Sequence, residues 1–189
     1  SENRIETPRD DLWVDTERTG EYSDVEGSEE AEILAELRSE PWRDVVARRF
    51  AEQNKWLYDI ITCRSRGLFL DVLPVKTGGN FLDVGSGWGQ VALPLSSQGN
   101  VFCLDVTLPR LEILRQIAQQ EQAQLHYICG NFCTFPFAEN EFDLVIFNGS
   151  LEWLALGAEN QSIWAVQSAA LRKTYDILAP GGVVYIGIE

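Results

Sequence analysis

Apolar residues in the second half of the chain follow two alternating periods. Short apolar runs occupy residues 81–84, 101–106, 125–129, 142–147 and 183–188, as is typical of buried strands. Between them, residues 108–122 and 160–178 repeat apolar side chains every three or four positions, which predicts amphipathic helices. This alternation predicts an α/β fold: right-handed βαβ units forming a doubly wound, mainly parallel sheet with helices on both faces.

The first 77 residues have a different pattern. Residues 1–28 are acidic and hold few apolar anchors, which predicts a loosely ordered arm. Residues 29–77 repeat apolar side chains at helical spacing and predict an N-terminal helical extension, interrupted near Arg66 and Gly67. We therefore expect three parts: the arm (1–28), the helical region (29–77) and the α/β domain (78–189).

The stretch NFLDVGSGWGQ, residues 80–90, predicts a ligand-binding turn after the first strand of the α/β domain. Gly85, Gly87 and Gly89 permit positive φ angles and close approach of the backbone to a ligand. Asp83 lies inside the apolar strand, where an unpaired carboxylate would cost on the order of several kcal/mol. In a doubly wound sheet, ligands bind beyond the carboxyl ends of the strands, so this turn marks the expected site.

Charge and cysteine content narrow the function further. Of the net charge of −14, residues 1–40 carry −10, and Lys and Arg form no cluster, so nucleic acid is not an expected partner. No apolar run reaches the roughly 18 residues of a membrane span, and we expect a cytoplasmic protein. Cys63, Cys103, Cys129 and Cys133 form no CxxC pair and have no zinc-like His spacing, so we expect no metal.

Glycine-rich turns of this kind serve dinucleotides or S-adenosylmethionine. The dinucleotide pattern GxGxxG would place Gln90 at its third glycine, where the helix should approach the strand. DVGSGWG instead resembles the first motif, D/E-x-G-x-G-x-G, of the class I (Rossmann-like) S-adenosylmethionine-dependent methyltransferases. Four later segments resemble further motifs of that family in the same order: VFCLDV, YICGNFCTFPFAENEFDLVIFN, NGSLEWL and LAPGGVVYIGI.

The resemblance covers about residues 78–189 and implies strand order 3-2-1-4-5 and S-adenosylmethionine as cofactor. It implies that Asp105 accepts hydrogen bonds from the ribose hydroxyls and that the Asn131 amide oxygen, where an Asp is common, accepts from the adenine amino group. The Phe132 N–H would meet the adjacent ring nitrogen, and the Asn148 carbonyl would face the methionine ammonium. We expect Asp83 to orient the glycine turn by accepting its N–H groups. The expected cofactor-binding residues are Asp83, Gly85, Ser86, Gly87, Asp105, Val106, Asn131, Phe132 and Asn148.

The resemblance also implies that residues 29–77 form a lid over the cofactor. Candidate lid residues are Trp42, Trp56, Tyr58, Arg64 and Arg66, an arginine being suited to the methionyl carboxylate. Glu152 and Trp153 are candidates for a substrate pocket or for simple packing. The sequence identifies no catalytic base. The implied reaction transfers a methyl group to a small-molecule or protein acceptor.

The chain ends at Glu189, directly after the fifth strand, whereas this family has two further strands. We therefore expect a truncated domain. Were the chain complete, the edge of the fifth strand would favour self-association. Two alternative functions stay open at this point: an NAD-binding Rossmann oxidoreductase, and a non-catalytic interaction module with a methyltransferase-like fold.

Overall fold

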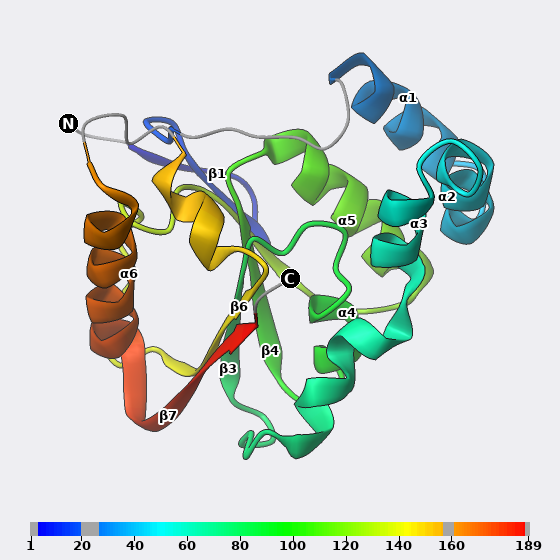
Figure 1. The fold of residues 1–189 in the computed structure, drawn as a ribbon. Helices are drawn as coiled ribbons and strands as arrows, with labels where there is room; N and C mark the ends of the chain where they lie inside the picture. The colour runs from blue at the N-terminus through cyan, green and yellow to red at the C-terminus, as the bar shows by residue number, and fades with distance from the viewer. Residues whose placement is uncertain (1–3, 20–26, 157–160, 188–189) are drawn as a thin grey trace.

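A seven-stranded sheet forms the centre of the molecule (Figure 1). The computed structural model describes residues 4–19, 27–156 and 161–187, without the side chains of Ser28 and residues 64–66. The strands lie in the order β1-β2-β5-β4-β3-β6-β7. Their bounds are β1 Ile5–Arg9, β2 Leu12–Asp15, β3 Asn80–Val84, β4 Asn100–Asp105, β5 His126–Cys129, β6 Phe142–Asn148 and β7 Leu178–Gly187.

Five neighbouring strands of the sheet, β3 to β7, form the predicted α/β core. Each pairs in parallel with its neighbours, in the order β5-β4-β3-β6-β7, which confirms the expected 3-2-1-4-5 arrangement. Strand β7 begins earlier than expected: the apolar run predicted a strand at 183–188, whereas β7 starts at Leu178 and includes Pro180, Gly181 and Gly182. A register irregularity against β6 and a φ of 81° at Gly181 accommodate these residues.

The expectation of a loosely ordered arm is wrong for residues 5–15. Strands β1 and β2 form an antiparallel hairpin, and β2 pairs in parallel with β5, with Leu12 beside Tyr127 and Val14 beside Cys129. Leu12 is buried in the core between the sheet and its helices. Leu12 and Val14 therefore form one face of an additional sheet strand, while Trp13 packs on the opposite face.

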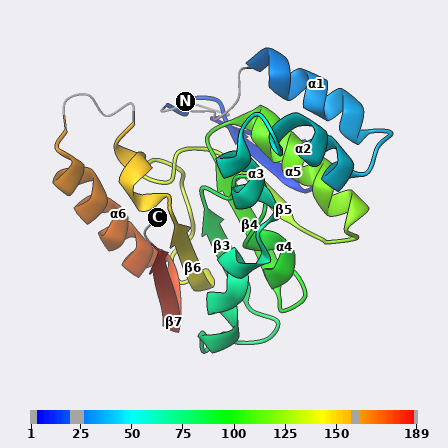
Figure 2. The ribbon, with the colours of Figure 1, turned by 45° about the vertical axis from the view of Figure 1, so that its right-hand side comes forward.

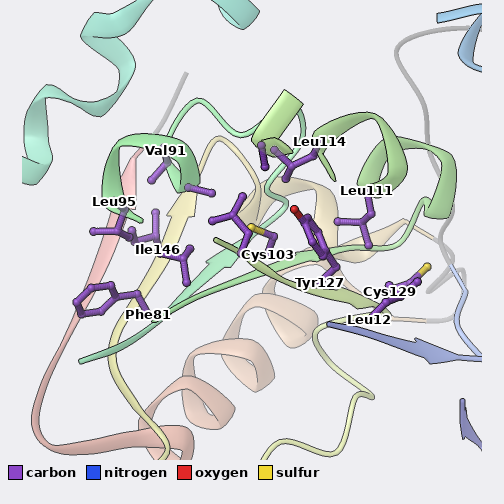
Figure 3. Close-up of a cluster of buried hydrophobic side chains, with 14 of the residues drawn as sticks. Leu12, Phe81, Val91, Leu95, Cys103, Leu111, Leu114, Tyr127, Cys129 and Ile146 are labelled. Atoms are coloured by element: carbon purple, nitrogen blue, oxygen red, sulfur yellow. The ribbon is translucent and has the colours of Figure 1, made fainter. Parts of the chain in front are cut away.

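Helices cover both faces of the sheet (Figures 1 and 2). Helices α4 (Ala92–Leu95) and α5 (Leu108–Gln120) lie on one face, and α6 (Ile163–Ile177) lies on the other. Along β3 the side chains alternate, so that Phe81 joins the cluster under α4 and α5 while Leu82 and Val84 join the cluster under α6. Figure 3 shows the first cluster, in which Tyr127 of the sheet faces Leu111 and Leu114 of α5, and Ile146 lies beside Val91 and Leu95.

The helical region is held against the end of α5. It comprises α1 (Gly27–Leu37), α2 (Trp42–Phe50), α3 (Lys55–Thr62) and the 3₁₀ helix η1 (Arg64–Val72). The break between α2 and α3 is additional to the interruption that we predicted near Arg66 and Gly67, and the Asn54 side chain caps α3 there by accepting from Leu57 N at 3.1 Å. Gln120 Nε2 donates to the Leu37 and Glu40 carbonyls, and Trp42 Nε1 donates to Glu121 at 2.6 Å.

The substitution Leu12→Ala tests whether the N-terminal hairpin belongs to the folded core. Because Leu12 is only 1% exposed, we expect its truncation to lower the free energy of unfolding by about 2–4 kcal/mol. The exposed Thr7 on β1 provides a control, and Thr7→Ala should change the free energy of unfolding by less than about 0.5 kcal/mol. Urea unfolding of both variants checks this, and a Leu12→Ala protein as stable as wild type would show that the hairpin is not part of the core.

Candidate functional site

A cavity of about 560 Å³ lies at the carboxyl ends of the central strands. Strand β3 stands at the point where the chain order reverses, with β4 on one side and β6 on the other, which is where ligands bind in doubly wound sheets. The structure brings all nine residues expected at the cofactor site to this cavity: Asp83, Gly85, Ser86, Gly87, Asp105, Val106, Asn131, Phe132 and Asn148. They come from the ends of four adjacent strands.

The glycine turn after β3 takes the conformation that its sequence predicts. Gly85, Gly87 and Gly89 have φ angles of 74°, 51° and 85°. The N–H groups of Gly85 and Ser86 both donate to the Leu104 carbonyl of β4, at 2.8 and 3.0 Å. A Cβ on Gly85 would lie 2.6 Å from the Ser150 Cβ, so only glycine fits between the turn and the segment after β6.

Asp83 does not organise the glycine turn as we expected. The turn N–H groups of Gly85 and Ser86 go to Leu104, whereas the backbone N–H of Ala92, at the start of α4, interacts with the Asp83 carboxyl. Burial, and after it the nearby charge of Asp105, raises the pKa of Asp83 to about 7, against the Ala92 N–H, which lowers it. Asp83 is thus a buried carboxyl with a raised pKa on the cavity wall.

Asp105 ends β4 with its carboxylate held at the cavity. Its Oδ1 accepts from Thr107 N at 2.9 Å, and its Oδ2 lies 4.0 Å from Arg110 Nη1. Asp105 is not the N-cap of the next helix, because Thr107 occupies the N-cap position of α5. Arg110, a cavity residue that sequence reasoning missed, is 8% exposed and follows in the first turn of that helix.

Asn131 and Phe132 follow β5 on the far side of Asp105. Gly130 N donates to the Asp105 carbonyl at 2.9 Å, which joins the two strand ends. The Asn131 amide is held on both sides: Oδ1 accepts from Cys133 N at 2.9 Å, and Nδ2 donates to the Thr19 carbonyl at 3.2 Å. Phe132 is fully buried and contributes an apolar wall to the cavity.

Three buried polar atoms at the cavity have no hydrogen-bond partner among the described residues: Ser86 Oγ, Ser150 Oγ and Trp88 Nε1. Ser86, Ser150 and Trp88 are each at least nine-tenths buried. Because buried hydroxyls and indole N–H groups are nearly always hydrogen-bonded, these atoms mark where a polar ligand group would bind. Sequence reasoning missed Ser150 and Trp88 as site residues, although both lie inside the quoted motifs.

The outer part of the cavity is mostly apolar. Helix α3 contributes Trp56 and Ile60, and the segment around η2 (Leu151–Ala155) contributes Glu152, Trp153, Leu154 and Leu156. Trp56 and Trp153 are 64% and 51% exposed, which is unusual for tryptophan. Trp42 and Tyr58 do not line the cavity, and the side chains of Arg64 and Arg66 lie outside the described residues.

The arrangement suits a nucleoside that carries a polar chain. The carboxylate of Asp105 can accept from two adjacent hydroxyls, Val106 and Phe132 can flank a flat ring, and the unpartnered hydroxyls stand beside the glycine turn. Among the described residues, no group of three His, Cys, Asp or Glu side chains is placed to hold a metal ion. The fold and the cavity therefore define a nucleoside-binding α/β domain.

Comparison with known proteins identifies the family. The model of the methyltransferase domain family matches residues 82–186, which is more than half of the chain, and the chain therefore belongs to that family. A ubiquinone/menaquinone biosynthesis C-methyltransferase of Ruegeria sp. (strain TM1040) is 30% identical over 60% of this chain and 43% of the relative. A malonyl-[acyl-carrier protein] O-methyltransferase of Pseudescherichia vulneris is 32% identical over 64% and 43%. The chain thus spans less than half the length of these two relatives.

A solved structure agrees on the fold. A phosphoethanolamine N-methyltransferase 2 of Haemonchus contortus, in complex with S-adenosylhomocysteine, superimposes with a TM-score of 0.57. The alignment covers 76% of this chain and 35% of that one at 21% identity. Similarity at this level of identity shows a shared fold.

The raised pKa of Asp83 predicts a pH dependence of stability. Asp83 keeps its proton up to about pH 7 in the folded protein but loses it near pH 4, the ordinary range for an aspartate, in the unfolded chain. The folded state therefore binds more protons between these values, and its free energy of unfolding should fall as the pH rises from about 4 to 7, by at most about 1.4 kcal/mol per unit.

Urea unfolding at a series of pH values compares Asp83→Asn with wild type. In Asp83→Asn the free energy of unfolding should fall less between about pH 4 and 7, because an amide does not titrate. The control Asp176→Asn, at an exposed position of α6, should follow the wild-type profile. Parallel profiles for Asp83→Asn and wild type would show that Asp83 is ionised throughout.

Proposed function

We propose that this chain binds S-adenosylmethionine and is the cofactor-binding part of a methyltransferase that acts on a small-molecule acceptor. The observation that carries the proposal is the meeting of four strand ends, with Asp105, Asn131, Asn148 and the glycine turn, around one cavity. Membership of the methyltransferase domain family supports the same reaction class. The curated relatives named above act on small molecules or on an acyl group carried by a protein, according to their names.

Each part of the cavity suits one part of the proposed cofactor. Asp105 would accept from the ribose hydroxyls, and Asn131 and Phe132 would receive the adenine. The hydroxyls of Ser86 and Ser150 and the indole N–H of Trp88 would hold the polar methionyl end. Asn148 would face the ammonium group at the end of β6. Asp83 and Asp105 give the cavity the negative charge that favours a cationic ligand.

When bound, S-adenosylmethionine supplies a methyl group on a positively charged sulfur. The chain's contribution is to orient it, exclude water and admit the acceptor in line with the transferred carbon. The apolar outer part of the cavity, with Trp56, Ile60 and Trp153, would cover the reacting region and bind apolar parts of the acceptor. Glu152 is the ionisable side chain among the η2 residues of the cavity and would stand closest to an acceptor that loses a proton.

We further propose that residues 29–77 act as the cover of this site, with α3 as the element that faces the cavity. A cytoplasmic location stays a prediction of the sequence. Among the described residues, no helix is both long and apolar enough to cross a membrane. Self-association through β7, the last strand in the order of the sheet, also stays a prediction.

Calorimetric titration with S-adenosylhomocysteine tests the proposed cofactor. Wild type should bind it, and Asp105→Ala should lose about 100-fold in affinity, because two hydrogen bonds to a charged group contribute about 1.5 kcal/mol each. Glu139→Ala, at an exposed loop position, is the control and should bind like wild type. Binding of NAD(H) in place of S-adenosylhomocysteine would favour the oxidoreductase alternative, and binding of neither would favour the interaction module.

Ser150→Ala tests the methionyl end of the cavity separately. Removal of the buried hydroxyl should weaken S-adenosylhomocysteine by about tenfold, because a polar ligand group loses its partner. Adenosine lacks the amino-acid chain and should bind the variant and wild type equally. An equal loss for both ligands would place Ser150 at the nucleoside instead.

A further inference from the structure

The N-terminal hairpin reaches the proposed adenine end of the cavity through residues 15–19, which we name the 15–19 turn. Arg18 Nε donates to the Val106 carbonyl at 2.9 Å, and the Thr19 carbonyl accepts from Asn131 Nδ2 at 3.2 Å. Val106 and Asn131 both line the cavity, directly after β4 and β5. One short segment thus bonds to the two loops between which the adenine would lie.

The 15–19 turn is itself rigidly placed. Asp15 is fully buried, and Arg4 donates to both of its carboxylate oxygens, at 2.8 and 2.5 Å, which holds the pKa of Asp15 below its usual range. Arg18 Nη1 bonds to the Asp15 carbonyl at 3.2 Å, and Glu17 N bonds to Asp15 Oδ1 at 3.0 Å. The parallel pairing of β2 with β5 sets the register that brings these groups to Asn131.

The contact with Thr19 helps to set the orientation of the Asn131 side-chain amide. A carbonyl oxygen can only accept, so Thr19 requires the NH₂ group of Asn131 on its side, and Cys133 N requires the oxygen on the other. An amide turned by half a rotation would lose both bonds. The resemblance noted in the sequence places Asn131 where an Asp is common. The Thr19 carbonyl gives a physical reason for an amide here, because a carboxylate would face that carbonyl oxygen to oxygen.

We propose that the 15–19 turn is a specificity element for the base: by fixing the Asn131 amide it presents an acceptor oxygen, and so selects a 6-amino purine over a 6-oxo purine. The inference rests on the proposed function, since it takes the base of S-adenosylmethionine as the ligand group at Asn131. An amide free to turn would offer its NH₂ group to a 6-oxo purine and bind both bases. Arg18 acts here as a positioning residue, because its contact is with the Val106 carbonyl.

The experiment measures the affinities of S-adenosylhomocysteine and of its 6-oxo analogue, S-inosylhomocysteine, by calorimetry. Arg18→Ala should lower the ratio of the two affinities about fivefold, because the 15–19 turn then loses its bond to the Val106 carbonyl and holds the Thr19 carbonyl less firmly against Asn131 Nδ2. Arg9→Ala removes the ion pair of the same hairpin with Glu112 of α5, away from the two loops, and should leave the ratio unchanged. A ratio in Arg18→Ala equal to that of wild type would overturn the inference.

A second variant separates orientation from general loosening of the loops. In the double variant Arg18→Ala/Asn131→Asp, both side-chain oxygens accept, so the preference for the 6-amino base should return whichever way the carboxylate turns. Loss of preference in the double variant would also overturn the inference. Failure of wild type to bind S-adenosylhomocysteine would overturn the proposed function, and this inference with it, whereas binding with unchanged selectivity in Arg18→Ala would overturn this inference alone.

Discussion

The candidate site depends on a single backbone acceptor, the Leu104 carbonyl near the end of β4, which receives the N–H groups of both Gly85 and Ser86. These two bonds tie the glycine turn of β3 to the neighbouring strand, which fixes the distance between the turn and Asp105, the next residue of β4. The close contact of Gly85 with Ser150 then fixes the segment after β6. These backbone hydrogen bonds and the close contact at Gly85 therefore set the shape of the cavity. The side chains of the site project from strand ends whose relative positions these contacts fix.

Two acidic side chains on adjacent strands give this site its electrostatic character. Asp83 and Asp105 both line the cavity, and the charge of Asp105 adds to burial in raising the pKa of Asp83. Bringing carboxyls together in a low-dielectric cavity costs free energy unless a cation offsets it. The proposed cofactor carries a sulfonium and an ammonium group, and these would supply such a cation.

The sequence predicted the parts of the molecule that depend on local signals. Short apolar runs located β3 to β6, and the glycines located the turn, because both follow from the local requirements of buried strands and of positive φ angles. The hairpin of residues 5–15 was missed because its two short strands are stabilised by distant partners, β5 for Leu12 and Val14, and Arg4 for Asp15. Ser150 was missed for a similar reason: its place beside Gly85 arises only when β6 lies next to β3.

The bonds between α2 and the end of α5 have a consequence for ligand access. Trp42 and Arg43 are hydrogen-bonded to Gln120 and Glu121, and Gln120 also reaches the Leu37 and Glu40 carbonyls. A swing of the entire helical region would break all of these contacts together. A displacement of α3 alone, whose Trp56 and Ile60 face the cavity, would leave them intact. In the proposed function as a cover, the eight residues of α3 are therefore the part that could move without breaking these contacts.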